Sequence, residues 1–185
     1  MYLATKHDAG HDSDPAWQVT LVSGPLLSLD DNPADTYLSD TWWYGRNQLA
    51  WDWTHQTTGS YPLDGVGYHV YVAQGSTDAA TVTSGIAANL EAVESVMDAE
   101  DPGNPRQVWI SELGWTSDYV GMDGQADDLE AGLTYVKGET RVALTSWFCL
   151  LDWPGASYGL LTAANDDPAS EKPAWSRFQA VAAEP

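Results

Sequence analysis

The sequence predicts an α/β fold made of four strand–helix units with parallel strands. Short segments that are nearly continuous in apolar residues recur along the 185-residue chain, and each is followed by a longer segment with helical spacing. Strands without polar alternation are typical of parallel sheets that helices cover on both faces. Four such units form either an open sheet or half of an eight-unit barrel, and this pattern leaves both architectures open.

The expected strands are 18–23, 65–72, 107–112 and 142–151. Gly24 and Pro25 end the first strand, and Pro33 takes the first position of a helix capped by Asp31 or Asn32. That helix ends somewhere within 44–58, and apolar spacing predicts the later helices at 78–99, 123–136 and 173–182. Because no linker or repeat interrupts the series, we expect residues 1–185 to form a single domain.

The chain is strongly acidic, with 27 Asp and Glu against 7 Lys and Arg and a net charge of -20. This balance argues against nucleic acid and anionic membranes as partners, since both attract basic patches. It fits an ordinary solvated surface, and it equally fits a halophilic protein, in which high salt screens the repulsion between carboxylates. No segment approaches the ~20 apolar residues of a membrane span.

The single cysteine, Cys149, excludes an intrachain disulfide and a cysteine-based zinc cluster. His7, His11 and Asp12 lie close together, but they stand in a polar N-terminal segment where we expect them to be solvated, so we expect neither metal nor cofactor. Residues 1–10 contain no apolar core of a signal peptide, and the compartment stays open.

The segment VWISELGW, residues 108–115, carries the strongest chemical signal. In an extended strand Val108, Ile110 and Glu112 point to one face. A carboxylate at the end of such a strand needs partners or an escape to solvent. Gly114 allows the backbone to turn there, which would leave Glu112 at the mouth of a cavity, where barrel active sites lie.

Two further segments are rich in groups that bind sugars. In DGVGYHVY, residues 64–71, His69 and Tyr71 share one face and can hydrogen-bond a carboxylate or a sugar hydroxyl. The segment WFCLLDWP, residues 147–154, is by itself a buried strand followed by an aromatic loop. Ten Trp and nine Tyr against two Phe indicate that some aromatic rings line a groove, because such rings suit carbohydrate faces.

Taken in order, these three segments resemble the glycoside hydrolases of clan A, which are (β/α)8 barrels, with families 39 and 5 nearest in pattern. The resemblance runs from about residue 14 to residue 175 and matches strands 5–8, which makes the chain half a TIM barrel. It implies a retaining mechanism on β-linked sugars. Glu112 would be the nucleophile and His69 or Tyr71 would orient it. The sugar rings would contact three tryptophans, Trp115, Trp147 and Trp153.

The sequence departs from this family at the acid/base residue. Such enzymes carry that glutamate after an asparagine on strand 4, and no Asn-Glu pair occurs here. We therefore expect activity to be weak or lost. We also expect the open edges of a half barrel to pair in a homodimer, which would bring Asp152 of one chain toward Glu112 of the other as a substitute acid.

Three other readings stay open. A non-catalytic carbohydrate-binding protein would keep the aromatic groove without the acid, and a purely structural half barrel would bind no ligand. A flavodoxin-like sheet is the alternative architecture, although no glycine-rich phosphate loop follows the first strand.

Overall fold

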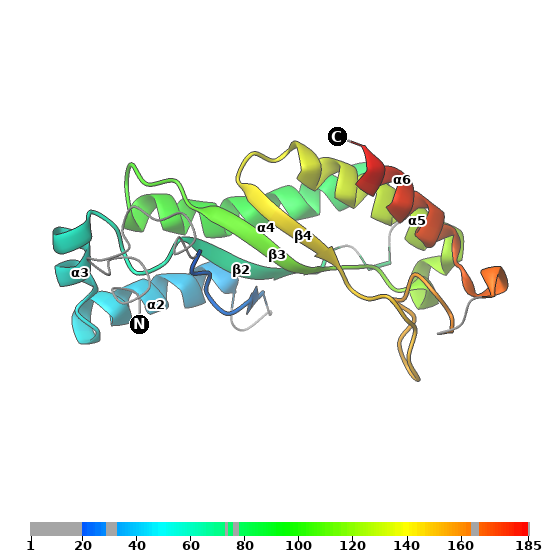
Figure 1. Cartoon of the computed structure of the whole chain (residues 1–185), viewed down its shortest axis with the longest axis horizontal. Coiled ribbons are helices and arrows are strands. Elements are labelled where there is room, and N and C mark those ends of the chain that lie inside the picture. The colour runs from blue at the N-terminus through cyan, green and yellow to red at the C-terminus, as the bar shows by residue number, and fades with distance from the viewer. Residues whose placement is uncertain (1–19, 29–32, 73, 76–77, 164–166, 185) are drawn as a thin grey trace, which may run out of the picture. The chain divides into compact units, whose positions relative to one another are not determined.

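A computed structural model describes residues 20–28, 33–72, 74–75, 78–163 and 167–184. Four strands form one sheet in the order β1-β2-β3-β4, with helices between and after them (Figure 1). The strands are β1 (Leu26–Leu27), β2 (Gly65–Val70), β3 (Gln107–Leu113) and β4 (Val142–Trp147). The helices are α2 (Ala34–Gln48), α3 (Trp51–Thr58), α4 (Ala79–Glu100), α5 (Ser117–Gly138) and α6 (Pro173–Ala183), with a short 3-10 helix at Pro168–Ser170. The α/β prediction with four parallel strands is confirmed.

The chain packs as two compact units. The first is Met1–Tyr68 with Ala92–Trp109, and the second is His69–Glu91 with Ile110–Pro185. Each boundary falls inside an element, within β2, α4 or β3. The expectation of a single domain stays a prediction.

The first strand differs most from its prediction. Residues 18 and 19 lie outside the described part of the chain, and the described residues 20–23 form only one isolated parallel bridge, between Val22 and Gly65. The strand proper is Leu26–Leu27, after the Gly24-Pro25 pair that was expected to end it. Local turn signals were overridden because the backbone on both sides of the pair bonds to β2, as the hydrogen bond from Ser23 N to Gly65 O at 3.1 Å shows.

The first predicted helix is two helices in the structure. α2 ends at Gln48, and Ala50 takes a left-handed conformation, with φ 57°, before α3 begins. Pro33 is the residue before α2 rather than its first residue. The break places Trp51 against Gly45, where a β-carbon would overlap the indole. It also allows Trp51 to meet the fully buried Trp42 edge to face, with ring centroids 5.7 Å apart.

The second unit contains α5 and α6, which lie side by side in Figure 1. α5 begins six residues before its prediction, because Thr116 caps it by accepting a hydrogen bond from Asp118 N. Gly121, with φ 73°, kinks the helix where the apolar spacing starts, and this explains why the periodicity located only its later part. The core of this unit includes apolar residues of β2, α4, β3, α5 and α6, namely Val70, Val82, Ile86, Leu90, Ile110, Leu113, Leu129, Leu133, Val136 and Val181.

One acidic side chain lies inside this core. Asp128 of α5 has no exposed surface, and neither of its carboxylate oxygens has a hydrogen-bond partner. Burial raises the pKa of Asp128 to about 7, and the neighbouring charge of Asp127 adds to the rise. A buried carboxyl without partners is more stable as the neutral acid.

Asp128 is therefore expected to make the protein less stable as pH rises. Because the folded pKa of about 7 exceeds the ordinary 3.8, the folded state holds its proton longer, and stability falls between about pH 4 and pH 7. We expect Asp128→Asn to flatten this fall and to raise the free energy of unfolding at pH 8 by roughly 2–4 kcal/mol. Urea unfolding from pH 4 to pH 8 measures both. The matched control is Asp127→Asn, at a side chain 60% exposed, and an equal effect there would contradict the account.

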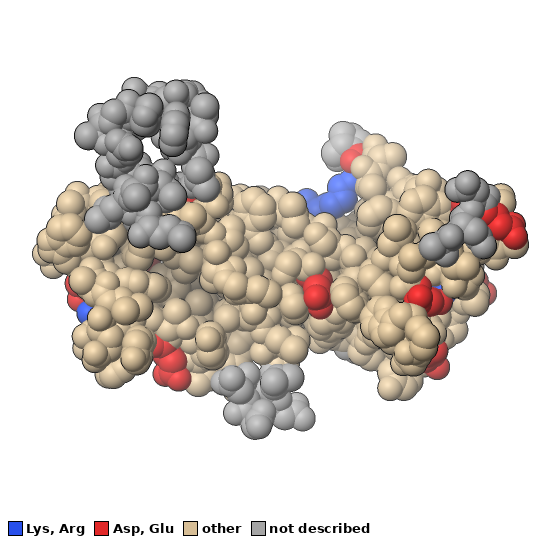
Figure 2. Space-filling view, turned by 60° about the horizontal axis from the view of Figure 1, so that its bottom comes forward, with Lys and Arg blue, Asp and Glu red and all other residues tan. Residues whose placement is uncertain are grey.

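The acidic side chains do not form one continuous patch on the face of the molecule shown in Figure 2. On the face shown in Figure 2, Asp and Glu appear as a few separate groups in a mostly uncharged surface. Adaptation to high salt stays a prediction. Within the described residues, no helix combines the length and the apolar character needed to cross a membrane.

Candidate active site

The structure brings Glu112, Tyr71 and His69 together. The phenol of Tyr71 donates a hydrogen bond of 2.6 Å to Glu112 Oε2, and His69 Nδ1 lies 3.3 Å from the same oxygen. The Glu112 side chain is 27% exposed and that of His69 is 21% exposed. The carboxylate is thus held by two partners while part of it still faces solvent.

Tyr71 is held in its protonated form. Burial raises the pKa of Tyr71 well above its usual value, and the hydrogen bond to Glu112 and the charge of that carboxylate raise it further. A phenol that keeps its proton at every physiological pH is a permanent donor to the carboxylate. It fixes the orientation of Glu112.

Glu112 does not share the burial of its predicted strand-mates. Val108, Ile110 and Leu113 have no exposed surface. Buried residues are therefore two positions apart at Val108 and Ile110, but the next fully buried residue of β3 comes three positions later. This change of period carries Glu112 away from the buried face and toward Tyr71 and His69. Alternation alone predicted one face for Val108, Ile110 and Glu112, and the structure corrects that.

Gly114 is required by a close approach rather than by a turn. A β-carbon there would overlap the carbonyl oxygen of Phe148 and lie 3.3 Å from the Tyr158 ring. Phe148 N also donates to Leu113 O at 2.9 Å. The glycine therefore lets the segment after β4 lie directly against the end of β3, next to the catalytic candidate.

An aromatic cluster stands beside this carboxylate. Tyr71 lies edge to face with Phe148 and with Tyr158, at centroid distances of 6.3 and 6.0 Å. Phe148 in turn contacts Trp153 at 5.4 Å, and Trp153 stacks on Tyr158 at 6.2 Å with an angle of 14°. Trp153 is 42% exposed, so part of its side chain is open to solvent. Phe148 and Tyr158 were not predicted for the site, although the aromatic-rich sequence around Trp153 is the signal that could have indicated them.

The other two predicted tryptophans, Trp115 and Trp147, pack against each other, and Trp147 bonds the backbone at Tyr158. Trp115 has no exposed surface, and its ring lies 6.0 Å from that of Trp147. A β-carbon at Gly132 of α5 would lie 2.6 Å from the Trp115 ring. Trp115 therefore packs in the core, where a sugar ring does not reach it. Trp147 is half-buried and donates from Nε1 to Tyr158 O at 3.1 Å, and a sugar contact there stays a prediction.

Asp152 is engaged within its own chain. Its Oδ1 accepts a hydrogen bond of 2.7 Å from Gly159 N and lies 2.9 Å from Lys172 Nζ. The ion pair is almost enclosed, with Lys172 1% and Asp152 19% exposed. These contacts tie Asp152 to Gly159 and Lys172 within its own chain. The role of Asp152 as a substitute acid stays a prediction. Lys172 was not predicted as a residue of the site.

Comparison with known proteins identifies the architecture. No protein-family model matches the sequence, and no curated protein matches it. Among solved structures, the chain is similar to a glycoside hydrolase family 128 (subgroup I) endo-β-1,3-glucanase from Amycolatopsis mediterranei, with 19% identity and a TM-score of 0.58. It is also similar to a subgroup II endo-β-1,3-glucanase from Sorangium cellulosum, with 20% identity and a TM-score of 0.56. Each match covers 90% of this chain but only 60% and 55% of those enzymes.

The fold is half of a (β/α)8 barrel. The open-sheet alternative is thereby set aside, and the predicted half barrel of four strand–helix units is confirmed. The more specific resemblance to family 39 stays a prediction.

Proposed function

We propose that this chain is the nucleophile-bearing half of a retaining glycoside hydrolase acting on β-linked glucose polymers. The observation that carries the proposal is that Tyr71 and His69 both contact one oxygen of Glu112, while Tyr71 also belongs to an aromatic cluster that ends in the partly exposed Trp153. The similar Amycolatopsis enzyme was crystallised with laminaritriose and laminaribiose, which makes β-1,3-linked glucose the first substrate to try.

In the proposed reaction Glu112 attacks the anomeric carbon. Tyr71 and His69 both contact Oε2, so Oε1 is the oxygen assigned to attack. A bond forms between Oε1 and the anomeric carbon while the bond from that carbon to the leaving oxygen breaks. Water then cleaves the resulting ester, giving back the carboxylate and a sugar that retains its configuration.

The proposed mechanism also needs a proton for the leaving group. Retention uses two carboxyl groups about 5–5.5 Å apart, and general acid catalysis contributes typically 10²–10⁴-fold. The sequence offers no Asn-Glu pair, and Lys172 holds Asp152. An aryl glycoside whose phenolate leaves unprotonated bypasses this step, so it is the substrate of choice for the chain as it stands.

A second candidate function is carbohydrate binding without turnover. The partly exposed Trp153, which stacks on Tyr158, favours it because aromatic rings bind sugar rings without any acid. Hydrolysis of 2,4-dinitrophenyl β-glucoside and calorimetric binding of laminaripentaose separate the two. Turnover supports the hydrolase, and binding without turnover supports the second candidate. If the protein shows neither turnover nor binding, both candidates are overturned.

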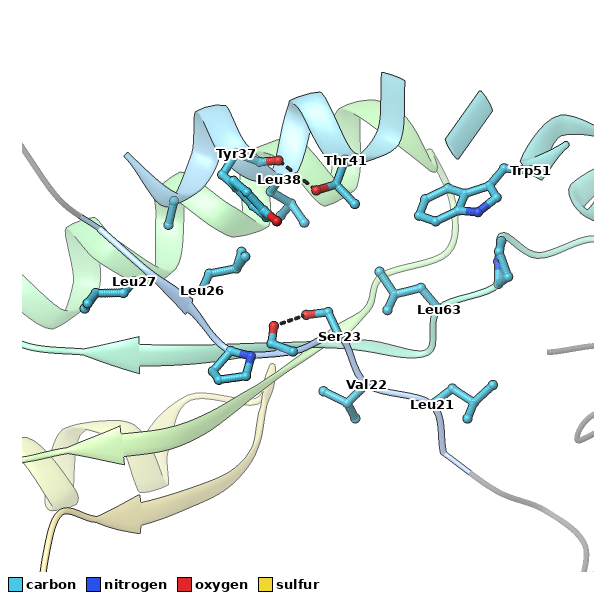
Figure 3. Close-up of a pocket in the computed structure, with 14 residues that line it drawn as sticks. Leu21, Val22, Ser23, Leu26, Leu27, Tyr37, Leu38, Thr41, Trp51 and Leu63 are labelled. Atoms are coloured by element: carbon cyan, nitrogen blue, oxygen red, sulfur yellow. Dashed lines mark hydrogen bonds between the residues drawn. The ribbon is translucent and has the colours of Figure 1, made fainter. Parts of the chain in front are cut away.

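We further propose that two copies pair through their open edges. In the described part of the chain β1 and β4 are the edge strands. Each carries an apolar cavity, of about 540 Å³ beside β1 and about 260 Å³ beside β4. Figure 3 shows the first, into which Leu26 of β1 and Leu38 of α2 point. An apolar cavity beside the unpaired edge of a strand is a surface that a strand–helix unit of a second copy would cover.

Leu144→Lys is expected to dissociate this homodimer. Leu144 lies in β4, lines its cavity and is 44% exposed. A charge there is costly once the edge is covered, because a buried cation without a partner loses its hydration. Sedimentation equilibrium should give twice the chain mass of 20.1 kDa for the wild type and the single mass for the variant. Met122→Lys, at a side chain 48% exposed in α5, is the control. A monomeric wild type at micromolar concentration would overturn the homodimer.

A further inference from the structure

Lys172 is an enclosed ammonium with three acceptors. Its Nζ donates to Asp152 Oδ1 at 2.9 Å, to Ser157 O at 3.0 Å and to Ser117 Oγ at 3.1 Å. The side chain is 1% exposed. A buried lysine is tolerated only where its charge is paired and its three N–H groups are bonded, and both conditions hold here.

Two of these acceptors belong to the aromatic loop, which we define as residues 152–161. Asp152 starts it and bonds Gly159 N, and Asp152 N donates to Leu161 O at 3.0 Å. Ser157 O also accepts from Gln125 Nε2 at 3.1 Å and from Ser117 N at 3.0 Å. The ammonium therefore ties the start and the middle of the loop to the first residue of α5.

The loop itself is closed by its own backbone. Trp153 and Ala156 exchange two hydrogen bonds, of 3.2 and 3.0 Å. Gly159 has no room for a β-carbon, which would overlap the backbone of Leu151 and Asp152. The stacked pair Trp153 and Tyr158 thus belongs to one internally bonded loop, whose base is held by the polar contacts of Asp152 and Ser157.

We propose that Lys172 is a positioning residue that holds the Trp153–Tyr158 pair at its working distance from Glu112. This inference rests on the proposed function, since it assigns the pair to sugar binding at that site. Lys172 touches neither the substrate nor the reacting atoms. It acts through the charge that fixes Asp152 and Ser157, while the cluster of Tyr71, Phe148 and Tyr158 carries that position to the carboxylate.

Amide hydrogen exchange tests the holding role without any ligand. Lys172→Met keeps the apolar stem and removes the charge, and Asp152→Asn keeps the shape of the other partner. In both variants the amides of residues 152–161 should exchange at least about 10-fold faster than in the wild type, with the amides of α4 unchanged. Lys137→Met is the control, because Lys137 donates to Val181 O and Glu184 O in another part of the same unit. Unchanged exchange in the loop, or equal acceleration along the whole chain in both variants, overturns the proposal.

A binding cycle tests the link to sugar recognition. Lys172→Met should weaken laminaripentaose binding by about 10-fold in the wild-type background and by less than about 2-fold in a Trp153→Ala background. A purely structural role would instead give the same loss in both backgrounds, and that result overturns the proposal. A wild type that binds no laminaripentaose counts against the proposed function, and the exchange result then decides the holding role by itself.

Discussion

Glu112→Gln is expected to lower the turnover of 2,4-dinitrophenyl β-glucoside by about 10⁴-fold or more. The amide keeps the size of the side chain and its contact with Tyr71, but it cannot form the ester with the anomeric carbon. The rate constant for release of the phenolate is the measurement. Glu130→Gln is the matched control, since Glu130 lies in α5, is 46% exposed and pairs with Arg177 away from this site.

The same pair of variants separates chemistry from binding. Glu112→Gln should keep its affinity for laminaripentaose within a few-fold, because Trp153 and Tyr158 are untouched. A loss of binding equal to the loss of turnover would mean that Glu112 holds the sugar rather than attacking it. An unchanged rate in Glu112→Gln would remove it from the mechanism.

Tyr71→Phe is expected to lower the same rate by about 10–10²-fold. The variant removes the 2.6 Å hydrogen bond to Glu112 Oε2 and leaves the ring contacts with Phe148 and Tyr158 in place. A hydrogen bond to a charged group contributes about 1.5–3 kcal/mol, which corresponds to this range. The rate should be measured together with the thermal midpoint, which distinguishes a mispositioned carboxylate from a destabilised fold.

Tyr119→Phe is the control for Tyr71, because the Tyr119 side chain is 73% exposed. The wild-type rate should also show no inflection from Tyr71 at high pH, since the raised pKa of this phenol keeps it protonated. A rate for Tyr71→Phe equal to that of the wild type would show that His69 alone orients the carboxylate.

The sequence was most informative about strands whose functional side chains stand at the end of the strand itself. The first residues of β2 and β3 and the contacts of His69 and Tyr71 with Glu112 could be predicted, whereas the last residues of the two strands differ from the prediction by two and one positions. The face of Glu112 could not, since the change of period after Ile110 depends on which neighbours β3 packs against. Trp115 shows the same limit, because its full burial is decided by Gly132 of α5, 17 positions further along the chain.

The roles of residues whose partners lie far away in the sequence could not be predicted. Lys172 and Asp152 are 20 positions apart, and neither stands in a recognisable spacing with Ser117. The left-handed Ala50, which divides the first predicted helix, is likewise not a helix-breaking residue, and the contact of Trp51 with Gly45 that accompanies the break cannot be read from local sequence. In each case tertiary packing overrides the local preference on which the prediction relied.

A trapped intermediate is the most direct test of Glu112 as the nucleophile. Incubation with 2,4-dinitrophenyl 2-deoxy-2-fluoro-β-glucoside slows hydrolysis of the glycosyl ester, and peptide mass spectrometry then locates the labelled residue. We predict a single 2-fluoroglucosyl group on Glu112, absent from Glu112→Gln. A label on another carboxylate, or steady turnover of the parent glucoside with Glu112 unlabelled, would contradict the account.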